Sequence, residues 1–258
     1  MDTNLNGKRA VVTVGAGGLG LVIARHLVQE GANVFVCDVD DAALADLPPE
    51  IIGQRVDVGD SAAIDAWLEP ILQGGIDILV NNAGIAGPTA PIEEIDDDGW
   101  RTCLSVCLDS QFFCTRRVAP VMKRQQSGAI INLTSTAGIL GMPNRAPYVA
   151  AKFAVVGLTK TLAMELGRDN IRVNAIAPGS VTGDRMDRVV AAHAQAESIA
   201  PEAVTRMYTA GTSMQTFVDP DEIADMVVYL ASDRGKRVSG QVIGVDGHSE
   251  TLYPRSFE

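Results

Sequence analysis

Tyr148 and Lys152 stand four residues apart in the stretch YVAAK. On a helix, this spacing places both side chains on one face, within reach of each other. A phenol with its ordinary pKa of about 10 is a poor base at neutral pH, but a neighbouring ammonium stabilises the phenolate and lowers that pKa. The pair is therefore a candidate proton-transfer group. Taken alone the pattern is common, and a lysine on a solvated helix face would give the same spacing.

Other residues that could do chemistry follow apolar runs. Ser135 closes the run GAIINLTS, the stretch NNAG (81–84) closes IDILVNN, and Asp38 ends NVFVCD. Open sheets of parallel strands bind ligands outside the carboxyl ends of the strands, because those ends meet at one edge. We therefore expect these residues to lie near one another.

A glycine-rich loop, VTVGAGGLG (12–20), follows the first apolar run and can be read in two registers. Gly15, Gly17 and Gly20 spell G-x-G-x-x-G, whereas Gly18 and Gly20 close a T-G-x-x-x-G-x-G pattern whose first glycine is replaced by Val14. Either loop lets the backbone approach a pyrophosphate at a helix N-terminus. The alternative is an ordinary glycine-rich turn.

Asp38 indicates which dinucleotide the loop would bind. A carboxylate at the end of the second strand accepts hydrogen bonds from the adenosine ribose hydroxyls and repels a 2′-phosphate. Asp40 and Asp41 follow it, and no arginine or lysine lies in the glycine loop or just after Asp38. This favours NAD over NADP. Asp38 could also cap the next helix, which is compatible with binding ribose.

The elements that must position these residues alternate along the chain. Apolar runs predict strands at residues 9–14, 33–38, 51–58, 76–82, 128–135, 171–177 and 241–245. Amphipathic stretches lie between them, and Asp219 with Pro220 predicts the start of a helix over 220–231. The pattern predicts one α/β domain over 1–258: a doubly wound parallel sheet of about seven strands with helices on both faces. The strandless segment 181–218 is expected to be a helical substrate lid or simply packed helices.

Composition narrows the partners. The 258 residues carry a net charge of −11, which argues against nucleic acid or an anionic membrane surface as a partner. No apolar run is long enough to span a bilayer, and the N-terminal residues lack a secretory signal, so we expect a cytoplasmic protein. The four cysteines form no C-x-x-C pair and have no histidine cluster nearby, so we expect buried, inert thiols and no metal site.

In these motifs the chain resembles the short-chain dehydrogenase/reductase family over nearly its whole length, through VVTVGAGGLG, NNAG, LTS, YVAAK, APGSVT (177–182) and SGQVIGVDG (239–247). The resemblance implies a Rossmann-type fold and selects the second glycine register. It implies catalytic roles for Ser135, Tyr148 and Lys152, with Tyr148 as acid/base. It also implies that NAD is bound by Gly15, Gly18, Leu19, Gly20, Asp38, Asp57, Val58, Asn82, Ala83, Gly84, Tyr148, Lys152, Pro178, Gly179, Val181 and Thr182.

The sequence departs from the family pattern at three positions. Val14 replaces the first glycine of the loop, and we interpret it as the last strand residue, with Gly15 making the tight turn. Cys107, in SVCLDSQFF, replaces the asparagine that is thought to hold a water in a proton relay to the lysine. His248 stands where a further glycine is usual, and we expect a structural role for it.

The leading hypothesis is an NAD-dependent alcohol dehydrogenase or ketoreductase that interconverts a secondary alcohol and its ketone. The alternative is an NAD-binding regulatory or scaffold protein whose catalysis is weakened by Cys107. An epimerase of the extended relatives is disfavoured, because the chain leaves little room for an added substrate domain. The substrate is expected to be a small molecule, and Arg145 and Arg185 are candidates for binding an anionic one. Relatives pair through the helices predicted at 100–124 and 148–167, which implies a homotetramer or homodimer.

Overall fold

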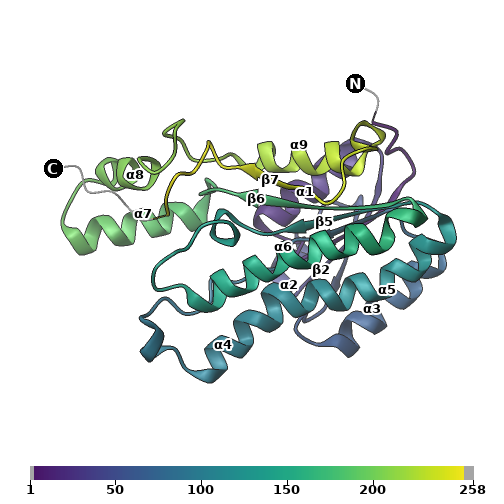
Figure 1. Ribbon diagram of the computed structural model, residues 1–258, viewed down its shortest axis with the longest axis horizontal. Coiled ribbons are helices and arrows are strands. Elements are labelled where there is room, and N and C mark those ends of the chain that lie inside the picture. The colour runs from purple at the N-terminus through teal and green to yellow at the C-terminus, as the bar shows by residue number, and fades with distance from the viewer. Residues whose placement is uncertain (1–2, 253–258) are drawn as a thin grey trace.

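The computed structural model describes residues 3–252, apart from the side chains at positions 184, 185, 192 and 196. Within that range, seven strands form one sheet in the order β3-β2-β1-β4-β5-β6-β7 (Figure 1). The strands are β1 (Arg9–Thr13), β2 (Asn33–Asp38), β3 (Ile51–Arg55), β4 (Ile78–Asn81), β5 (Gly128–Leu133), β6 (Ile171–Pro178) and β7 (Val242–Val245). The predicted doubly wound sheet is confirmed.

Every pair of neighbouring strands in the sheet is parallel. Their carboxyl ends therefore share one edge, as the alternating pattern of the sequence predicted. Most observed strands are shorter than the apolar runs; the run 51–58, for example, leaves the sheet after Arg55. Residues trimmed from the carboxyl ends of the runs, such as Asn82, Thr134 and Ser135, form loops at the carboxyl edge, which is where the candidate functional residues lie.

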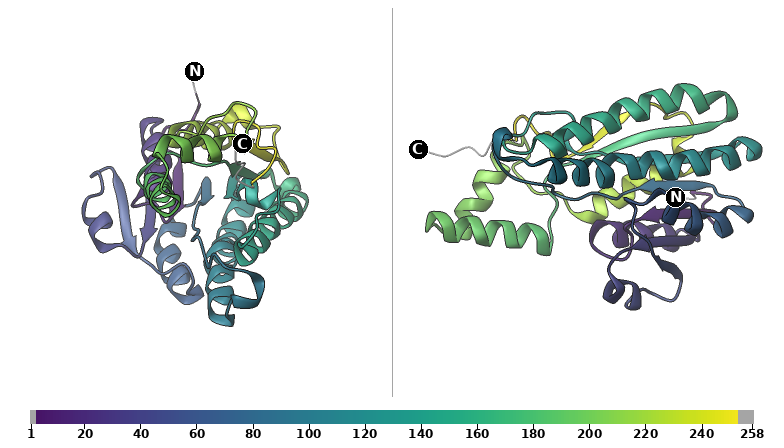
Figure 2. Two further views of the ribbon diagram at one scale, coloured as in Figure 1. Left: turned by 90° about the vertical axis from the view of Figure 1, so that its left-hand side faces the viewer. Right: turned by 90° about the horizontal axis from the view of Figure 1, so that it is seen from below.

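Helices cover both faces of the sheet, as Figure 2 shows end-on. One face carries α1 (Gly18–Gln29) and α9 (Pro220–Ala231), whose buried stripes include Leu27 and Val227. The other carries α3 (Ser61–Gln73), α5 (Ser110–Gln125) and α6 (Ala146–Leu166), with Trp67 and Met122 in the core. Removing such large apolar side chains from water stabilises each layer by about 2 kcal/mol per residue.

Helix α9 begins where the sequence predicted. Asp219 accepts a hydrogen bond from the backbone N–H of Asp221 and forms a capping box with Glu222, and Pro220 occupies the first turn. The shorter helices are α2 (Asp41–Ala45), α4 (Asp97–Leu104), α7 (Asp184–Glu197) and α8 (Pro201–Thr209). A π-helical turn, η2 (Ser105–Asp109), joins α4 to α5. The helix predicted at 100–124 is therefore continuous but locally widened, because a π-helical turn has i→i+5 hydrogen bonds.

The segment 181–218 contains α7 and α8 and projects beyond the carboxyl edge of the sheet (Figures 1 and 2). Its two ends are held together by a parallel bridge between Val181 and Val218. The N–H of Thr182 donates to the carbonyl of Val218, and the N–H of Val218 donates to that of Ser180, both at 2.9 Å. The helical character predicted for this segment is confirmed.

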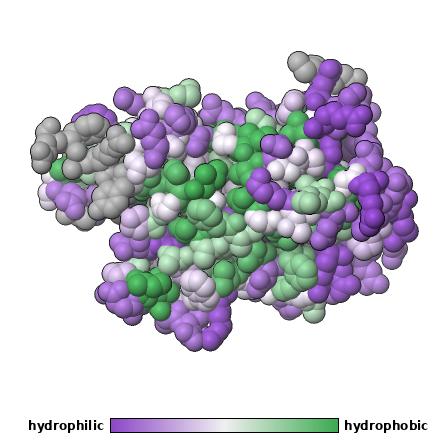
Figure 3. Space-filling model, viewed as in Figure 1, coloured by the Kyte–Doolittle hydropathy of each residue, from purple (hydrophilic) through white to green (hydrophobic). Residues whose placement is uncertain are grey.

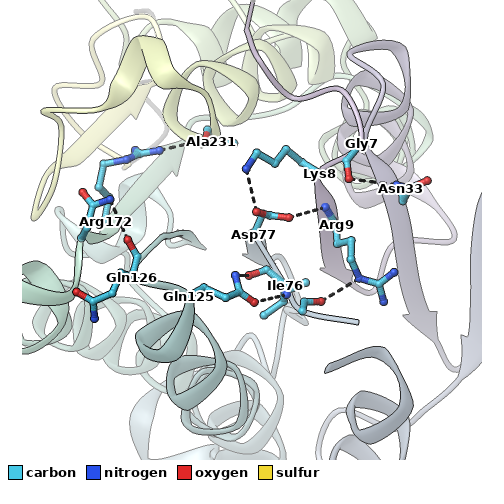
Figure 4. Close-up of polar contacts among 12 residues, drawn as sticks. Gly7, Lys8, Arg9, Asn33, Ile76, Asp77, Gln125, Gln126, Arg172 and Ala231 are labelled. Atoms are coloured by element: carbon cyan, nitrogen blue, oxygen red, sulfur yellow. Dashed lines mark hydrogen bonds and ion pairs between the residues drawn. The ribbon is translucent and has the colours of Figure 1, made fainter. Parts of the chain in front are cut away.

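The opposite, amino edge of the sheet is closed by polar contacts (Figure 4). Asp77 accepts from the Lys8 ammonium at 3.0 Å and from the backbone N–H of Arg9 at 2.9 Å. The Gln125 amide pairs with both backbone groups of Ile76. Arg172 donates to the carbonyl of Ala231 at 3.1 Å, at the C-terminus of α9. These side chains join strands to neighbouring segments at the amino edge. The candidate functional residues lie at the opposite, carboxyl edge.

Two features are absent from the part of the chain that the structure describes. No helix within 3–252 combines the length and the apolar character that crossing a membrane requires. Over the same part of the chain, no three histidine, cysteine, aspartate or glutamate side chains are grouped so that they could hold a metal ion.

Candidate active site and cofactor site

The glycine loop turns at Val14. Strand β1 pairs with β2 as far as Thr13, and Val14 then adopts a φ of +52°, in the left-handed region. Gly15 does not have a positive φ; it is confined instead by space, because a Cβ there would lie 2.7 Å from the Val36 side chain. Our expectation that Val14 ends the strand and Gly15 makes the turn is therefore wrong. A β-branched residue takes the strained conformation itself, at a cost of about 1–2 kcal/mol.

Asn82 holds this turn in place from the neighbouring strand. Its side-chain Nδ2 donates to the carbonyls of Thr13 and Val14, both at 3.0 Å. In return, the Thr13 hydroxyl accepts from the backbone N–H groups of Asn82 and Ala83, each at 3.0 Å. Four hydrogen bonds thus join the end of β4 to the end of β1, which brings the stretch NNAG against the glycine loop.

Gly20 allows α1 to start directly against this turn. A Cβ at Gly20 would lie 2.1 Å from the Val14 carbonyl and 2.7 Å from Asn82 Nδ2. Gly18 opens the helix with a φ of +51°, followed by Leu19, and Gly17 provides no side-chain cap. The first N–H groups of α1 therefore have no side-chain cap and lie at the positive end of the helix dipole. This arrangement suits a phosphate.

Asp38 is buried, with 6% of its surface exposed, at the end of β2. Its carboxylate accepts from the backbone N–H groups of Ala16 at 3.3 Å, Val39 at 2.8 Å and Asp40 at 3.3 Å. The side chain therefore helps to hold the shape of the glycine loop. Asp40, rather than Asp38, caps the next helix, α2.

Arg55 is a charged neighbour that reasoning from the sequence missed. It ends β3 in register with Asp38 on β2, and its guanidinium pairs with the carboxylate of Asp41 at 3.2 Å. The pairing depends on the packing of β3 against β2, which the spacing of residues along the chain does not reveal. Just beyond Arg55, Val58 is buried, and the Asp57 carboxylate accepts from the N–H of Gly59 at 2.8 Å.

Lys152 joins α6 to the end of β5. Its side chain is almost fully buried, and Nζ donates to the carbonyl of Leu133 at 2.8 Å. The Thr134 hydroxyl donates in the other direction, to the carbonyl of Lys152 at 2.7 Å. Nζ also lies 5.7 Å from the centre of the Tyr148 ring, so the spacing in YVAAK does place the two side chains together.

Ser135 follows Thr134 and is half-buried. Its Oγ caps a short 3₁₀ turn, Thr136–Gly138, by accepting from the N–H of Ala137 at 3.1 Å. This leaves the hydroxyl proton free to be donated to another group. The turn packs so tightly against α6 that a Cβ at Gly138 would lie 2.7 Å from the carbonyl of Lys152.

Arg145 adds a second cation beside Tyr148. Its guanidinium carbon lies 5.1 Å from the centre of the phenol ring, and Nη2 donates to the carbonyl of Ala86 at 2.8 Å. Arg185, the other arginine singled out in the sequence, has a side chain outside the described residues.

Cys107 lies in the π-helical turn η2 and reaches the loop after NNAG. Its Sγ accepts from the N–H of Ile85 at 3.4 Å and donates to the carbonyl of the same residue at 3.5 Å. A thiol therefore makes the two backbone contacts that a carboxamide could make at this position. The expectation of free, buried thiols is confirmed for all four cysteines.

Gln111, four residues after Cys107, was also missed. Its Nε2 donates to the carbonyls of Cys107 and Leu133, both at 3.3 Å, and Leu133 is the residue that Lys152 binds. The carbonyl of Cys107 thus accepts a hydrogen bond from the Gln111 side chain. The signal in the sequence was a polar residue on the buried face of a helix.

The turn after β6 also lies at the carboxyl edge of the sheet. Pro178 ends the strand, the N–H of Gly179 donates to the carbonyl of Val245 at 2.9 Å, and a Cβ at Gly179 would lie 2.9 Å from the Cα of Asp246. Val181 and Thr182 follow at the base of the 181–218 segment.

His248 is exposed, and its Nδ1 lies 2.7 Å from the Ser213 hydroxyl. It therefore joins the chain after β7 to the loop after α8.

Comparison with known proteins gives consistent matches over almost the full chain. A sequence profile described as "Enoyl-(Acyl carrier protein) reductase" matches residues 15–247. The chain is 37% identical over 253 residues to D-beta-hydroxybutyrate dehydrogenase from Cupriavidus necator, covering 94% of this chain and 98% of that protein. Its structure is similar to NAD+-bound xylitol dehydrogenase, with a TM-score of 0.87, 30% identity and coverage of 95% and 99% of the two chains. It is also similar to a variant of actinorhodin polyketide ketoreductase with NADPH, with a TM-score of 0.86, 33% identity and coverage of 95% and 98%.

The close approach at Gly20 gives a testable prediction. Gly20→Ala should lower the free energy of unfolding by about 2 kcal/mol, because the new methyl group must displace the Val14 carbonyl or the Asn82 amide. Gly17→Ala, in the same loop but with no atom within 4 Å of the added Cβ, should cost less than about 1 kcal/mol. Chemical denaturation of both variants measures the difference. Equal stabilities would contradict the packing described for the start of α1.

Proposed function

Since the chain belongs to the short-chain dehydrogenase/reductase family, we propose that it is an NAD-dependent oxidoreductase that interconverts a secondary alcohol and its ketone. The observation that carries this proposal is the buried Lys152 ammonium beside Tyr148, held by the carbonyl of Leu133 two residues before Ser135. A phenol, an ammonium and a hydroxyl thereby converge on the end of one strand. This is the set of groups needed to move a proton to or from a substrate oxygen.

Each of the three catalytic residues has a distinct task in this proposal. The Tyr148 hydroxyl takes the proton from the alcohol or returns it to the ketone oxygen. Lys152, fixed by its hydrogen bond to Leu133, stabilises the phenolate that Tyr148 becomes. Ser135 donates its hydroxyl proton to the same substrate oxygen and stabilises the negative charge that develops on it.

The residues at the carboxyl edge fit a nicotinamide dinucleotide, which when bound supplies the hydride acceptor or donor. The uncapped start of α1 and the close approach permitted by Gly20 suit a pyrophosphate, and the buried Asp38 carboxylate suits ribose hydroxyls. The residues that we propose hold the cofactor are Gly15, Gly18, Leu19, Gly20, Asp38, Asp57, Val58, Asn82, Ala83, Gly84, Tyr148, Lys152, Pro178, Gly179, Val181 and Thr182.

Charge at the end of β2 supports NAD over NADP. A 2′-phosphate would meet the Asp38 carboxylate, with Asp40 and Asp41 following directly. Arg55, the cation in register with Asp38 on the next strand, is paired with Asp41. Since the similar solved structures contain both NAD+ and NADPH, the preference rests on these side chains.

The substrate in this proposal is a small molecule that enters beneath the 181–218 segment, with α7 and α8 as its lid.

The face of the protein that is formed by α5 and α6 supports self-association. Helix α6 carries apolar residues all around its circumference, and Phe112, Phe153 and Met164 are exposed on α5 and α6. Figure 3 shows apolar residues gathered over the middle of this face. Such a patch favours a homodimer or homotetramer, and the four free thiols suit a cytoplasmic protein.

A second candidate function is favoured by Cys107 alone. With a thiol in place of the family's usual asparagine, the protein could bind NAD as a regulatory or scaffold protein with weakened catalysis. This alternative predicts binding without turnover, and a large gain of activity in Cys107→Asn.

Tyr148→Phe tests the proposed chemistry. Removing the hydroxyl should lower kcat with NAD and a panel of secondary alcohols by at least about 100-fold, because the proton-transfer group is lost while the ring remains. The measurement is the absorbance of reduced nicotinamide, and Tyr229→Phe, an exposed tyrosine on α9, is the control. Unchanged turnover in Tyr148→Phe would exclude Tyr148 as the acid/base.

Asp38→Asn tests the cofactor preference without a substrate. Losing the negative charge should raise the affinity for NADPH relative to NADH by about 10-fold, which corresponds to about 1.4 kcal/mol. Fluorescence titration of the reduced cofactors measures both dissociation constants. Asp46→Asn makes the same charge change at the exposed end of α2 and should leave the ratio unaltered. A wild-type protein that prefers NADPH would contradict the proposal.

A further inference from the structure

Gln111 is a buried amide in the first turn of α5 that contacts two segments at once. None of its surface is exposed, and its Nε2 donates to the carbonyls of Cys107 and Leu133, both at 3.3 Å. The carbonyl of Leu133 also accepts from Lys152 Nζ, at 2.8 Å. The Gln111 amide and the catalytic ammonium therefore meet on one oxygen atom, although no step of the proposed reaction uses Gln111.

The carbonyl of Leu133 lies just beyond the pairing of β4 with β5. That pairing ends with Asn81 opposite Asn132. The next two N–H groups after β4, those of Asn82 and Ala83, donate to the hydroxyl at the end of β1 instead of to β5. A carbonyl oxygen has two lone pairs, and at Leu133 one accepts from an ammonium and the other from an amide.

The π-helical turn η2 is the second segment that Gln111 contacts. The two side chains that follow this turn both bond to its backbone: the Ser110 hydroxyl donates to the carbonyl of Val106 at 2.7 Å, and Gln111 donates to that of Cys107. The Gln111 amide thus joins the turn between α4 and α5 to the end of β5, where Lys152 is bound.

The orientation of the Gln111 amide is set by its acceptors. Both neighbouring groups are carbonyls, which can only accept, so the NH2 group must face them and Oε1 is turned away. Oε1 is buried and has no hydrogen-bond partner among the described residues, which is costly. An apolar side chain of similar size would fill the same space without that cost. The two bonds of Nε2, rather than packing, are therefore what the amide contributes here.

We propose that Gln111 is a positioning residue for the catalytic lysine: its amide fixes the carbonyl of Leu133 in the place where that carbonyl holds the Lys152 ammonium beside Tyr148. The inference rests on the proposed function for the roles of Lys152 and Tyr148. Without the amide, the carbonyl and the ammonium bound to it can shift together. The ammonium then stabilises the phenolate less well, and proton transfer becomes slower.

The first experiment observes the lysine directly, in crystals of the full chain without cofactor or substrate. Wild type and Gln111→Met are compared at the contact between Lys152 Nζ and the carbonyl of Leu133. In Gln111→Met this contact should lengthen beyond hydrogen-bonding distance, or the Lys152 side chain should occupy a second position. An unchanged contact of 2.8 Å would overturn the proposal, whatever the activity of the protein.

Thr115→Val is the matched control for both experiments. Thr115 lies one turn after Gln111 on the same buried face of α5, and its hydroxyl accepts from the side chain of Asn81 at 3.3 Å. Its replacement also removes a buried side-chain hydrogen bond of α5, but it leaves the carbonyl of Leu133 untouched. The Lys152 contact should therefore be unchanged in Thr115→Val.

The second experiment asks whether the position of the lysine affects turnover. In Gln111→Met, kcat for alcohol oxidation with NAD should fall about 10-fold, because the proton-transfer group is misplaced. The acidic limb of the pH profile of kcat should move to higher pH, because the phenolate is less well stabilised. KM for the alcohol should change less than about twofold, because the lost interaction acts in the transition state. Gln111→Leu, which also lacks the donor, should behave in the same way and replaces Gln111→Met if that variant does not fold.

The outcomes separate this inference from the proposed function. In an active enzyme, an unchanged kcat in the Gln111 variants, or an equal loss in Thr115→Val, would overturn the role of Gln111. A wild-type protein with no turnover on the alcohol panel would count against the proposed function, while the crystal structures would still decide whether Gln111 holds the lysine in place.

Discussion

A buried ammonium organises the site. Placing a charged group in the interior is costly unless it is hydrogen-bonded, and Lys152 meets this requirement through the carbonyl of Leu133 at the end of β5. That single contact fixes the distance between α6 and the sheet. The reverse bond from Thr134 to the carbonyl of Lys152 makes the junction rigid. Tyr148 and Ser135 are positioned through it, because one lies a helical turn before Lys152 and the other follows Thr134.

A comparable junction holds the glycine loop. The amide of Asn82 and the hydroxyl of Thr13 exchange hydrogen bonds across two neighbouring strands, and the turn at Val14 is held within this arrangement. The left-handed valine persists because its carbonyl is bonded and the start of α1 is packed directly against it. The strain is thus sustained by contacts from another strand rather than by the local sequence.

Two side chains of the segment that joins α4 to α5 lie near groups that surround Lys152. Cys107 and Gln111 lie on one helical segment, yet both reach groups that Lys152 also contacts or borders: the Leu133 carbonyl and the space beside Gly84. The π-helical turn places Cys107 at the contact with Ile85 while α5 continues along the sheet. A change at Gln111 therefore alters the hydrogen bonding at the carbonyl that Lys152 also binds.

The sequence by itself determined the parallel sheet, the order of strands and helices along the chain, and the edge of the sheet at which the candidate functional residues lie. Apolar runs alternating with helical stretches allow few arrangements other than a parallel sheet, and the polar residues after each run must then meet at one edge. It also predicted that Tyr148 and Lys152 would be neighbours and that Asp219 would cap α9, since both depend on spacing within one helix.

Only the tertiary structure decided what depends on contacts between distant segments. Local propensity predicted that glycine, not valine, would make the turn after β1, but bonds from Asn82 on β4 override that preference. The pairing of Arg55 with Asp41, the bond from Lys152 to Leu133 and the contact of Cys107 with Ile85 join residues from different elements. The physical reason is that hydrogen bonding, burial and charge act over a few ångströms in space, and sequence spacing reveals such distances only within a single helix or strand.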